Sequence, residues 1–128
     1  MTIIEVLFAI VILSGVMLSM ARFGQAFTRA SRNAATLALA SDLAAARVEM
    51  IKGHADYATI VASYDADVET SADATANLSM VGSDGYIRTT RAVRTVSDTT
   101  DFVTVTVTVT AAELTAPVAK TVLIAANP

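Results

Sequence analysis

The pattern of apolar and polar positions sets apart the first twenty-one residues, Met1 to Ala21. Glu5 carries the only ionisable side chain among them, and the polar interruptions are three hydroxyl side chains and one glycine. About twenty apolar residues in a helix are long enough to cross the hydrocarbon core of a bilayer, and a helix satisfies its own backbone groups there. The next charged residue is Arg22, so we expect a membrane-spanning segment to end at residue 21.

Apolar and small residues continue at three- and four-residue spacing from Val6 to Ile51. This pattern predicts one continuous helix over residues 1–53 with a packed seam along it, and no proline interrupts the helix. At a rise of ~1.5 Å per residue the helix is roughly 75–80 Å long, so its first half must contact lipid or other helices. Lys52 in the last turn and Gly53 after it predict where the helix ends. Alanine predominates after Arg22 and makes the second half a thin rod that a sheet can approach closely.

The C-terminal part of the chain has the residue pattern of β-strands. We predict three strands, at residues 85–97, 102–110 and 118–126, joined by turns at 98–101 and 111–117. In the second strand four valines alternate with four threonines, which places the valines on one face and the threonines on the other. Short links imply antiparallel pairing, with the valine face on the alanine-rich half of the helix and the threonine face in water. The fold class is therefore α+β, one long helix packed through its C-terminal half against a small antiparallel sheet.

Length and charge limit the functional classes. The chain has 128 residues, which is enough for one domain, and 54% of them are hydrophobic, above the usual range for a soluble domain. Its formal net charge of −3 provides no global basic field, so DNA is an unlikely partner. The sequence has no cysteine, which excludes disulfides and thiolate metal sites.

Glu5 is the unusual residue of the apolar run. A carboxylate inside an apolar helix is costly and usually marks a functional site with a partner. No basic side chain lies nearby in sequence, so we expect the partner to be an α-amino group or a group on another chain. The N-terminal motif MTIIEVLF resembles the start of mature type IV pilins and pseudopilins, in which a short leader is removed and the new first residue is N-methylated.

The resemblance implies roles for individual residues. Met1 would be the processed, N-methylated terminus, where the family usually has Phe, and Glu5 the assembly carboxylate that meets the positive N-terminus of a neighbouring subunit. Residues 1–21 would form a transmembrane or filament-core half-helix, and residues 22–128 a globular domain made of helix 22–53, a connecting loop 54–84 and a β-meander 85–128. Helix-weakening Ser14 and Gly15 predict local loosening between residues 14 and 24 in an assembled filament.

The resemblance also implies partners and a location. The partners would be further copies of the chain in a helical filament, inner-membrane lipid before assembly, the pilus assembly machinery and a leader peptidase. The chain would wait in the inner membrane and then become part of a filament at the cell surface. Three arginines follow the apolar run, and the positive-inside rule alone would keep that side cytoplasmic, whereas the resemblance predicts that it is exported.

Other candidate sites have simple structural explanations. Asp65, Asp67, Glu69 and Asp73 are spaced like part of a calcium loop, but Thr70 stands where such a loop needs glycine and Ala76 where it needs a bidentate acid. We therefore expect a solvated acidic loop and no metal site. Arg88, Arg91 and Arg94 form a basic cluster, which we expect to pair with acids of the same or a neighbouring subunit.

His54 is the only histidine, and we expect it at the surface just past the helix end. Asn77 begins a sequence with the form of a glycosylation acceptor, so glycosylation there is possible. The chain has no Gly-x-Ser-x-Gly elbow, no Walker loop and no Gly-rich dinucleotide turn, so the sequence favours neither an enzyme nor a cofactor-binding protein.

Our interpretation is a structural subunit of a type IV pilus-like filament. One alternative is a pseudopilin of a type II secretion system, whose filament is short and periplasmic. A second alternative, from another class, is a membrane-anchored binding module that works as a monomer. The monomeric module should tolerate a neutral residue at position 5 and show no self-association, whereas loss of the Glu5 charge should impair polymerisation of a pilus subunit.

Overall fold

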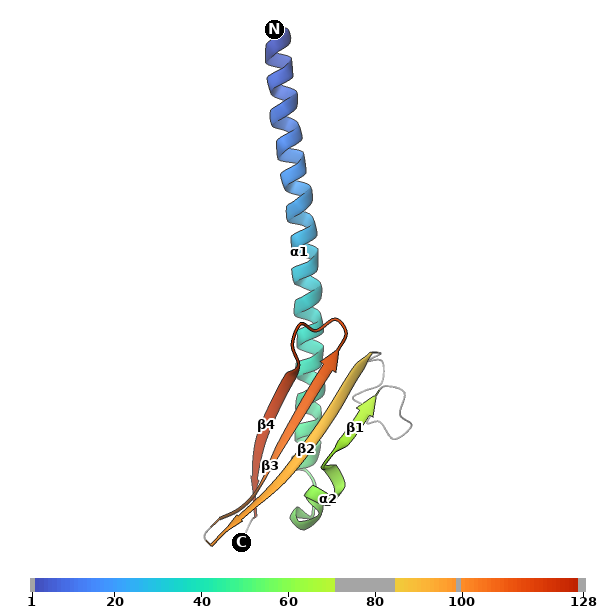
Figure 1. Ribbon diagram of the computed structural model, residues 1–128, viewed down its shortest axis with the longest axis vertical. Coiled ribbons are helices and arrows are strands. Elements are labelled where there is room, and N and C mark those ends of the chain that lie inside the picture. Colours follow the sequence, from blue (N-terminus) through green and yellow to red (C-terminus); the bar gives the residue numbers. More distant parts are fainter. Residues whose placement is uncertain (1, 71–84, 99, 127–128) are drawn as a thin grey trace. The chain divides into compact units, whose positions relative to one another are not determined.

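The computed structural model describes residues 2–70, 85–98 and 100–126 (Figure 1). Contacts within the chain divide it into two compact units, Met1–Ala35 and Thr36–Pro128. The described part of the first unit is helical from Ile3 onward. The second unit combines the C-terminal part of the same helix, two short helices and a four-stranded sheet, and it confirms the predicted α+β class.

Helix α1 runs from Ile3 to Lys52 without interruption. It ends where the sequence predicts, because the amide of Gly53 still donates to the carbonyl of Glu49 (3.1 Å) and the chain then turns away. The predicted loosening between residues 14 and 24 concerns an assembled filament and stays a prediction, since the isolated chain is helical there. Within that stretch the hydroxyl of Ser19 donates to the carbonyl of Gly15 (2.8 Å), one turn back.

Two short helices follow α1 and lie beside the sheet. A 3-10 helix, η1, spans Tyr57–Thr59, and α2 spans Ile60–Tyr64. The carboxylate of Asp56 caps η1 by accepting a hydrogen bond from the amide of Ala58 (3.0 Å). The connecting loop expected over residues 54–84 therefore contains helical turns near its start, and Ile60 of α2 is buried in the core.

The sheet is an antiparallel meander with strand order β1-β2-β3-β4. Its strands are β1 (Asp67–Thr70), β2 (Tyr86–Ser97), β3 (Thr100–Ala111) and β4 (Val118–Ala125). The three predicted strands are present with small shifts at their ends. Strand β1 was not predicted, and it pairs with the first part of β2.

The core lies between the sheet and the C-terminal part of α1. All four valines of the alternating strand are buried, and the threonines between them are only partly covered, as predicted. From α1 the small residues Ala40 and Ala44 are buried, and so are Leu43, Val48 and Ile51. Small side chains at two of these positions allow the helix backbone to approach the valine face, which explains the alanine-rich sequence.

The acidic stretch before β2 is not a simple solvated loop. That prediction is wrong for Asp67 and Glu69, which lie on β1, and Glu69 is buried with 7% of its surface exposed. The physical reason is pairing: Glu69 stands opposite Arg88 in the β1–β2 register, so the carboxylate enters the core beside a cation. Asp73 and Ala76 lie outside the described residues.

Candidate functional site: the apolar N-terminal part of helix α1

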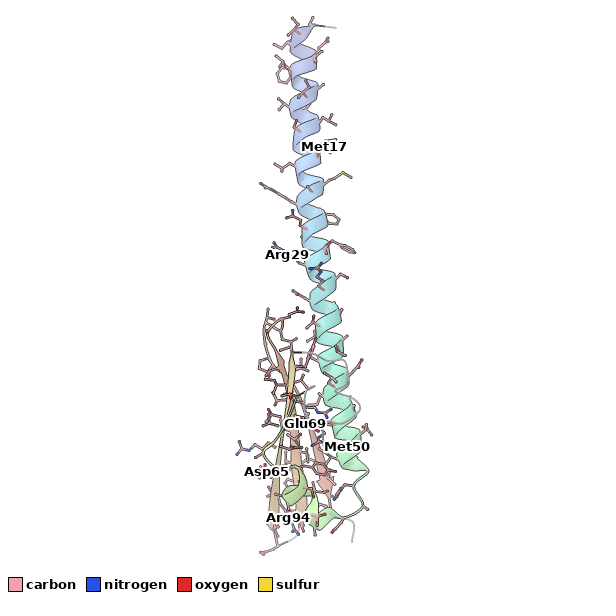
Figure 2. The ribbon with its side chains drawn as sticks, turned by 90° about the vertical axis from the view of Figure 1, so that its right-hand side faces the viewer. Met17, Arg29, Met50, Asp65, Glu69 and Arg94 are labelled. Carbon is pink, nitrogen blue, oxygen red and sulfur yellow. The ribbon has the colours of Figure 1, made fainter. Side chains whose placement is uncertain are left out.

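The first unit presents apolar side chains around the whole helix. Every described residue from Thr2 to Ala35 is exposed, including large side chains such as Phe8 (65%) and Met17 (65%), which projects from the ribbon in Figure 2. By length and composition this helix could cross a membrane. An uncovered apolar helix of this kind is stable only when lipid or other helices surround it.

Glu5 lies in the first turn of α1 and has a partner within its own chain. Its Oε2 accepts a hydrogen bond from the backbone amide of Thr2 (2.7 Å), while the amide of Glu5 donates to the carbonyl of Thr2 (3.0 Å). This is one half of a capping box, in which the residue at the third helical position reaches back to the cap. The sequence reasoning looked for a cation and missed this bond, although the spacing T-x-x-E is itself a capping signal.

The capping bond leaves the charge of Glu5 without a cation among the described residues of its chain. An amide and the positive end of the helix dipole favour a carboxylate at this position. Glu5 is exposed, so its second oxygen is accessible to a further donor. Met1, the predicted assembly and N-methylation residue, lies outside the described residues, and so does Asn77, the possible glycosylation residue.

The second unit holds a network in which two buried arginines bind the buried Glu69 and the half-buried Asp67. Arg88 on β2 is fully buried and binds Glu69 Oε2 through Nε (2.8 Å) and Nη2 (2.7 Å), while its Nη1 donates to the carbonyl of Leu43 (3.1 Å). Arg47 on α1 binds the other oxygen of Glu69 (3.1 Å) and also pairs with Asp67. Glu69 therefore links the helix to the sheet, and it lies between them in Figure 2.

The predicted arginine cluster lies on β2 and is divided between the two faces of the sheet. Arg88 and Arg94 are on the face toward the helix, and both pair with acids of the same chain, as one of the two predicted outcomes requires. Arg91 is exposed on the opposite face. The cluster therefore does not form one basic surface.

Arg94, Asp101 and Tyr57 meet where β2 and β3 approach their connecting turn. Arg94 binds Asp101 with two contacts, Nε to Oδ1 (2.9 Å) and Nη2 to Oδ2 (2.5 Å), and the hydroxyl of Tyr57 donates to Oδ1 (2.8 Å). The Arg94 bonds lower the pKa of the Asp101 carboxyl from 3.8 to about 2, and the Tyr57 bond acts in the same direction. Partial burial and the bond to Asp101 raise the pKa of Tyr57 above 10.0.

The remaining candidates take part in local structure. His54 lies just past the helix end and is half-buried, and its ring nitrogens approach the hydroxyls of Thr59 (3.0 Å) and Tyr64 (3.1 Å). Asp65 accepts a hydrogen bond from the amide of Ala92 (3.0 Å). Over the part of the chain that the structure describes, no three His, Asp or Glu side chains are arranged to hold a metal ion.

Comparison of this chain with protein-family models, with curated proteins and with solved structures finds no match.

Proposed function

We propose that this protein is a structural subunit of a type IV pilus-like filament. The observation that carries the proposal is a helix whose first turns are apolar on every side and exposed, with one carboxylate, Glu5, near its N-terminal end. Such a surface needs either lipid or copies of the same helix. Its fold, a long helix with a small antiparallel sheet on its C-terminal part, agrees with the resemblance of the N-terminal motif.

The mechanism follows from two environments for the same helix. Before assembly the apolar residues lie in a membrane, where they satisfy the length requirement for a span. During assembly the helix leaves lipid for a bundle of identical helices, and a repeated head-to-tail contact of this kind extends into an open filament. Because buried charges need partners, Glu5 fixes the register by pairing with the positive N-terminus of a neighbouring subunit.

The capping bond favours a second candidate, the membrane-anchored monomer. If Glu5 serves only as a cap for α1, its hydrogen bond with the amide of Thr2 is sufficient, and no second chain is required. The two functions differ in what they demand at position 5. A cap needs an acceptor oxygen, which glutamine also has, whereas pairing with a cation needs the negative charge.

Two substitutions at position 5 separate these functions. Glu5→Gln keeps the acceptor and removes the charge, and Glu5→Ala removes both. We expect the unchanged protein to form filaments visible by electron microscopy, and both variants to insert in membranes but form few filaments. Asp42→Asn, an exposed charge change on the same helix, is the matched control and should polymerise normally. Normal filament yield from Glu5→Gln would contradict the pairing and favour capping alone.

A further inference from the structure

The helix segment that follows the apolar run carries a basic face. Arg22, Arg29 and Arg32 are exposed on α1, and no Asp or Glu lies between Glu5 and Asp42 in the sequence. Arg29 follows Arg22 by seven residues, which is about two helical turns, and Arg32 follows Arg29 by three, so the three side chains share one side of the helix. This part of the chain therefore has local positive charge in a protein whose net charge is −3.

The basic face includes a shallow groove. The groove is lined by Ala21, Gly24, Gln25, Thr28, Arg29 and Arg32. Ala21 and Gly24 have little or no side chain, so a ligand can approach the helix backbone closely between the guanidinium groups. The hydroxyl of Thr28 donates to the carbonyl of Gly24 (2.9 Å). The other polar groups that line the groove are the guanidinium groups of Arg29 and Arg32 and the amide of Gln25.

The apolar surface extends alongside the basic face. Phe23 and Phe27 stack with ring centroids 6.5 Å apart and remain 74% and 66% exposed. Apolar and basic surface therefore run side by side along the same turns of α1, just past the predicted span. The apolar run therefore does not stop abruptly at residue 21, but passes into a segment suited to the membrane surface.

We infer that the face formed by Arg22, Arg29 and Arg32 binds the phosphate of anionic phospholipid headgroups while the chain is held in the membrane. The inference rests on the membrane-inserted state of the proposed function. Side chains of an α-helix lean toward its N-terminus, so Arg29 and Arg32 lean back toward the apolar run and the bilayer surface. Arginine also presents a planar fork of donors that matches a phosphate, and Figure 2 shows Arg29 extending from the helix.

The basic face directly follows the apolar run, and this position favours lipid as its ligand. Arg22 adjoins the last residue of the predicted span, and Arg32 is ~15 Å further along the helix axis, within side-chain reach of a headgroup layer. Each basic residue close to a bilayer surface is attracted to anionic lipid by about 1 kcal/mol.

The test compares lipid retention by the full chain in detergent. The protein is mixed with equal amounts of phosphatidylglycerol and phosphatidylcholine that have the same acyl chains, and the lipids kept in the gas phase are counted by native mass spectrometry. We expect the unchanged chain to keep phosphatidylglycerol preferentially. Each of Arg22→Gln, Arg29→Gln and Arg32→Gln should lower that preference, by roughly fivefold per arginine near the surface. Far-UV circular dichroism checks that the variants stay helical.

Arg91→Gln is the matched control, because it removes one exposed positive charge from the sheet and should leave the lipid preference unchanged. Equal retention of both lipids by the unchanged chain, or a preference that survives all three substitutions, would overturn the inference. If the unchanged chain retains both lipids equally and the triple variant fails to assemble, the three arginines contact a second copy of the chain and not lipid. A chain that selects phosphatidylglycerol but forms no filaments would leave this inference in place and count against the filament.

Discussion

Glu69 and Arg88 form a buried ion pair across β1 and β2, with both Nε and Nη2 of the arginine on the same carboxylate oxygen at 2.8 and 2.7 Å. The other oxygen of Glu69 lies 3.1 Å from Nη1 of Arg47 on α1. The single negative charge of Glu69 therefore partly neutralises the charges of two buried arginines. A pair of this kind contributes little when it is intact, but it is strongly destabilising when one member is removed, because the remaining charges stay buried.

Glu69→Gln should accordingly lower the free energy of unfolding of the second unit by about 3–5 kcal/mol. Denaturant titration of the full chain in detergent, followed by near-ultraviolet circular dichroism of its tyrosines, measures this. Glu113→Gln, which removes an exposed acid, should change the value by no more than about 0.5 kcal/mol. Equal effects from the two variants would show that the burial of Glu69 carries no energetic consequence.

Acid should weaken the contact between Arg94 and Asp101. The pKa of Asp101 is about 2 in the folded chain, below its ordinary 3.8, so folding favours the ionised carboxyl. The stabilisation is complete above pH ~4 and is lost as the pH falls from about 4 toward 2. Melting temperatures recorded across this range should fall less steeply for Asp101→Asn than for the unchanged chain. An identical pH profile in the variant would contradict the assignment.

Shortening a valine of β3 should cost more than shortening a threonine of the same strand. Val105 is fully buried against α1. Val105→Ala removes two carbon atoms from the core and leaves a cavity, so it should lower the free energy of unfolding by about 2 kcal/mol. Thr108 lies on the opposite, partly covered face, and Thr108→Ala should cost no more than about 0.5 kcal/mol. The same denaturant titration compares them. A larger loss from the threonine variant would mean that the face assignment of β3 is wrong.

Ala66 occupies a backbone conformation that glycine adopts more easily. Its φ of 59° lies in the left-handed region, between the end of α2 and the start of β1. Ala66→Gly should raise the free energy of unfolding by about 1 kcal/mol, because relief of the Cβ clash exceeds the extra entropy of the unfolded chain. Ala58→Gly, at an exposed position in η1, should lower it instead. Destabilisation by both would indicate that Ala66 is not strained.

The regular elements of this protein could be predicted because their signals are local and repeated. The alternation of valine and threonine predicted the two faces of β3. The three- and four-residue spacing of apolar and small residues predicted that α1 continues to Lys52. Alanines at Ala40 and Ala44 indicated a close contact with the sheet, which the structure confirms. Each of these inferences needed no knowledge of residues far away in the sequence.

The charged network could not be predicted in the same way. Strand β1 has only four residues, and two of them are acidic, so its local sequence resembles a loop. Glu69 is buried only because Arg88, nineteen residues later, stands opposite it, and because Arg47 of α1 faces both acids. Such pairing over long sequence distances gives no periodic signal. Glu5 stands out in the sequence as the one charge of the apolar run, but its partner in the structure is the uncharged amide of Thr2, for which the spacing T-x-x-E is the only local signal.

The central position of β3 has a consequence for the fate of the unfolded chain. Residues 102–110 contain no charge and no proline and consist almost entirely of β-forming side chains, which is the composition of amyloid-forming segments. In the native sheet this strand is hydrogen-bonded on both sides, to β2 and to β4, so neither of its edges is open to another molecule. Pairing with β2 and β4 therefore protects β3 from aggregation. A chain that loses β4 would expose one edge of β3, whose composition favours pairing with copies of itself.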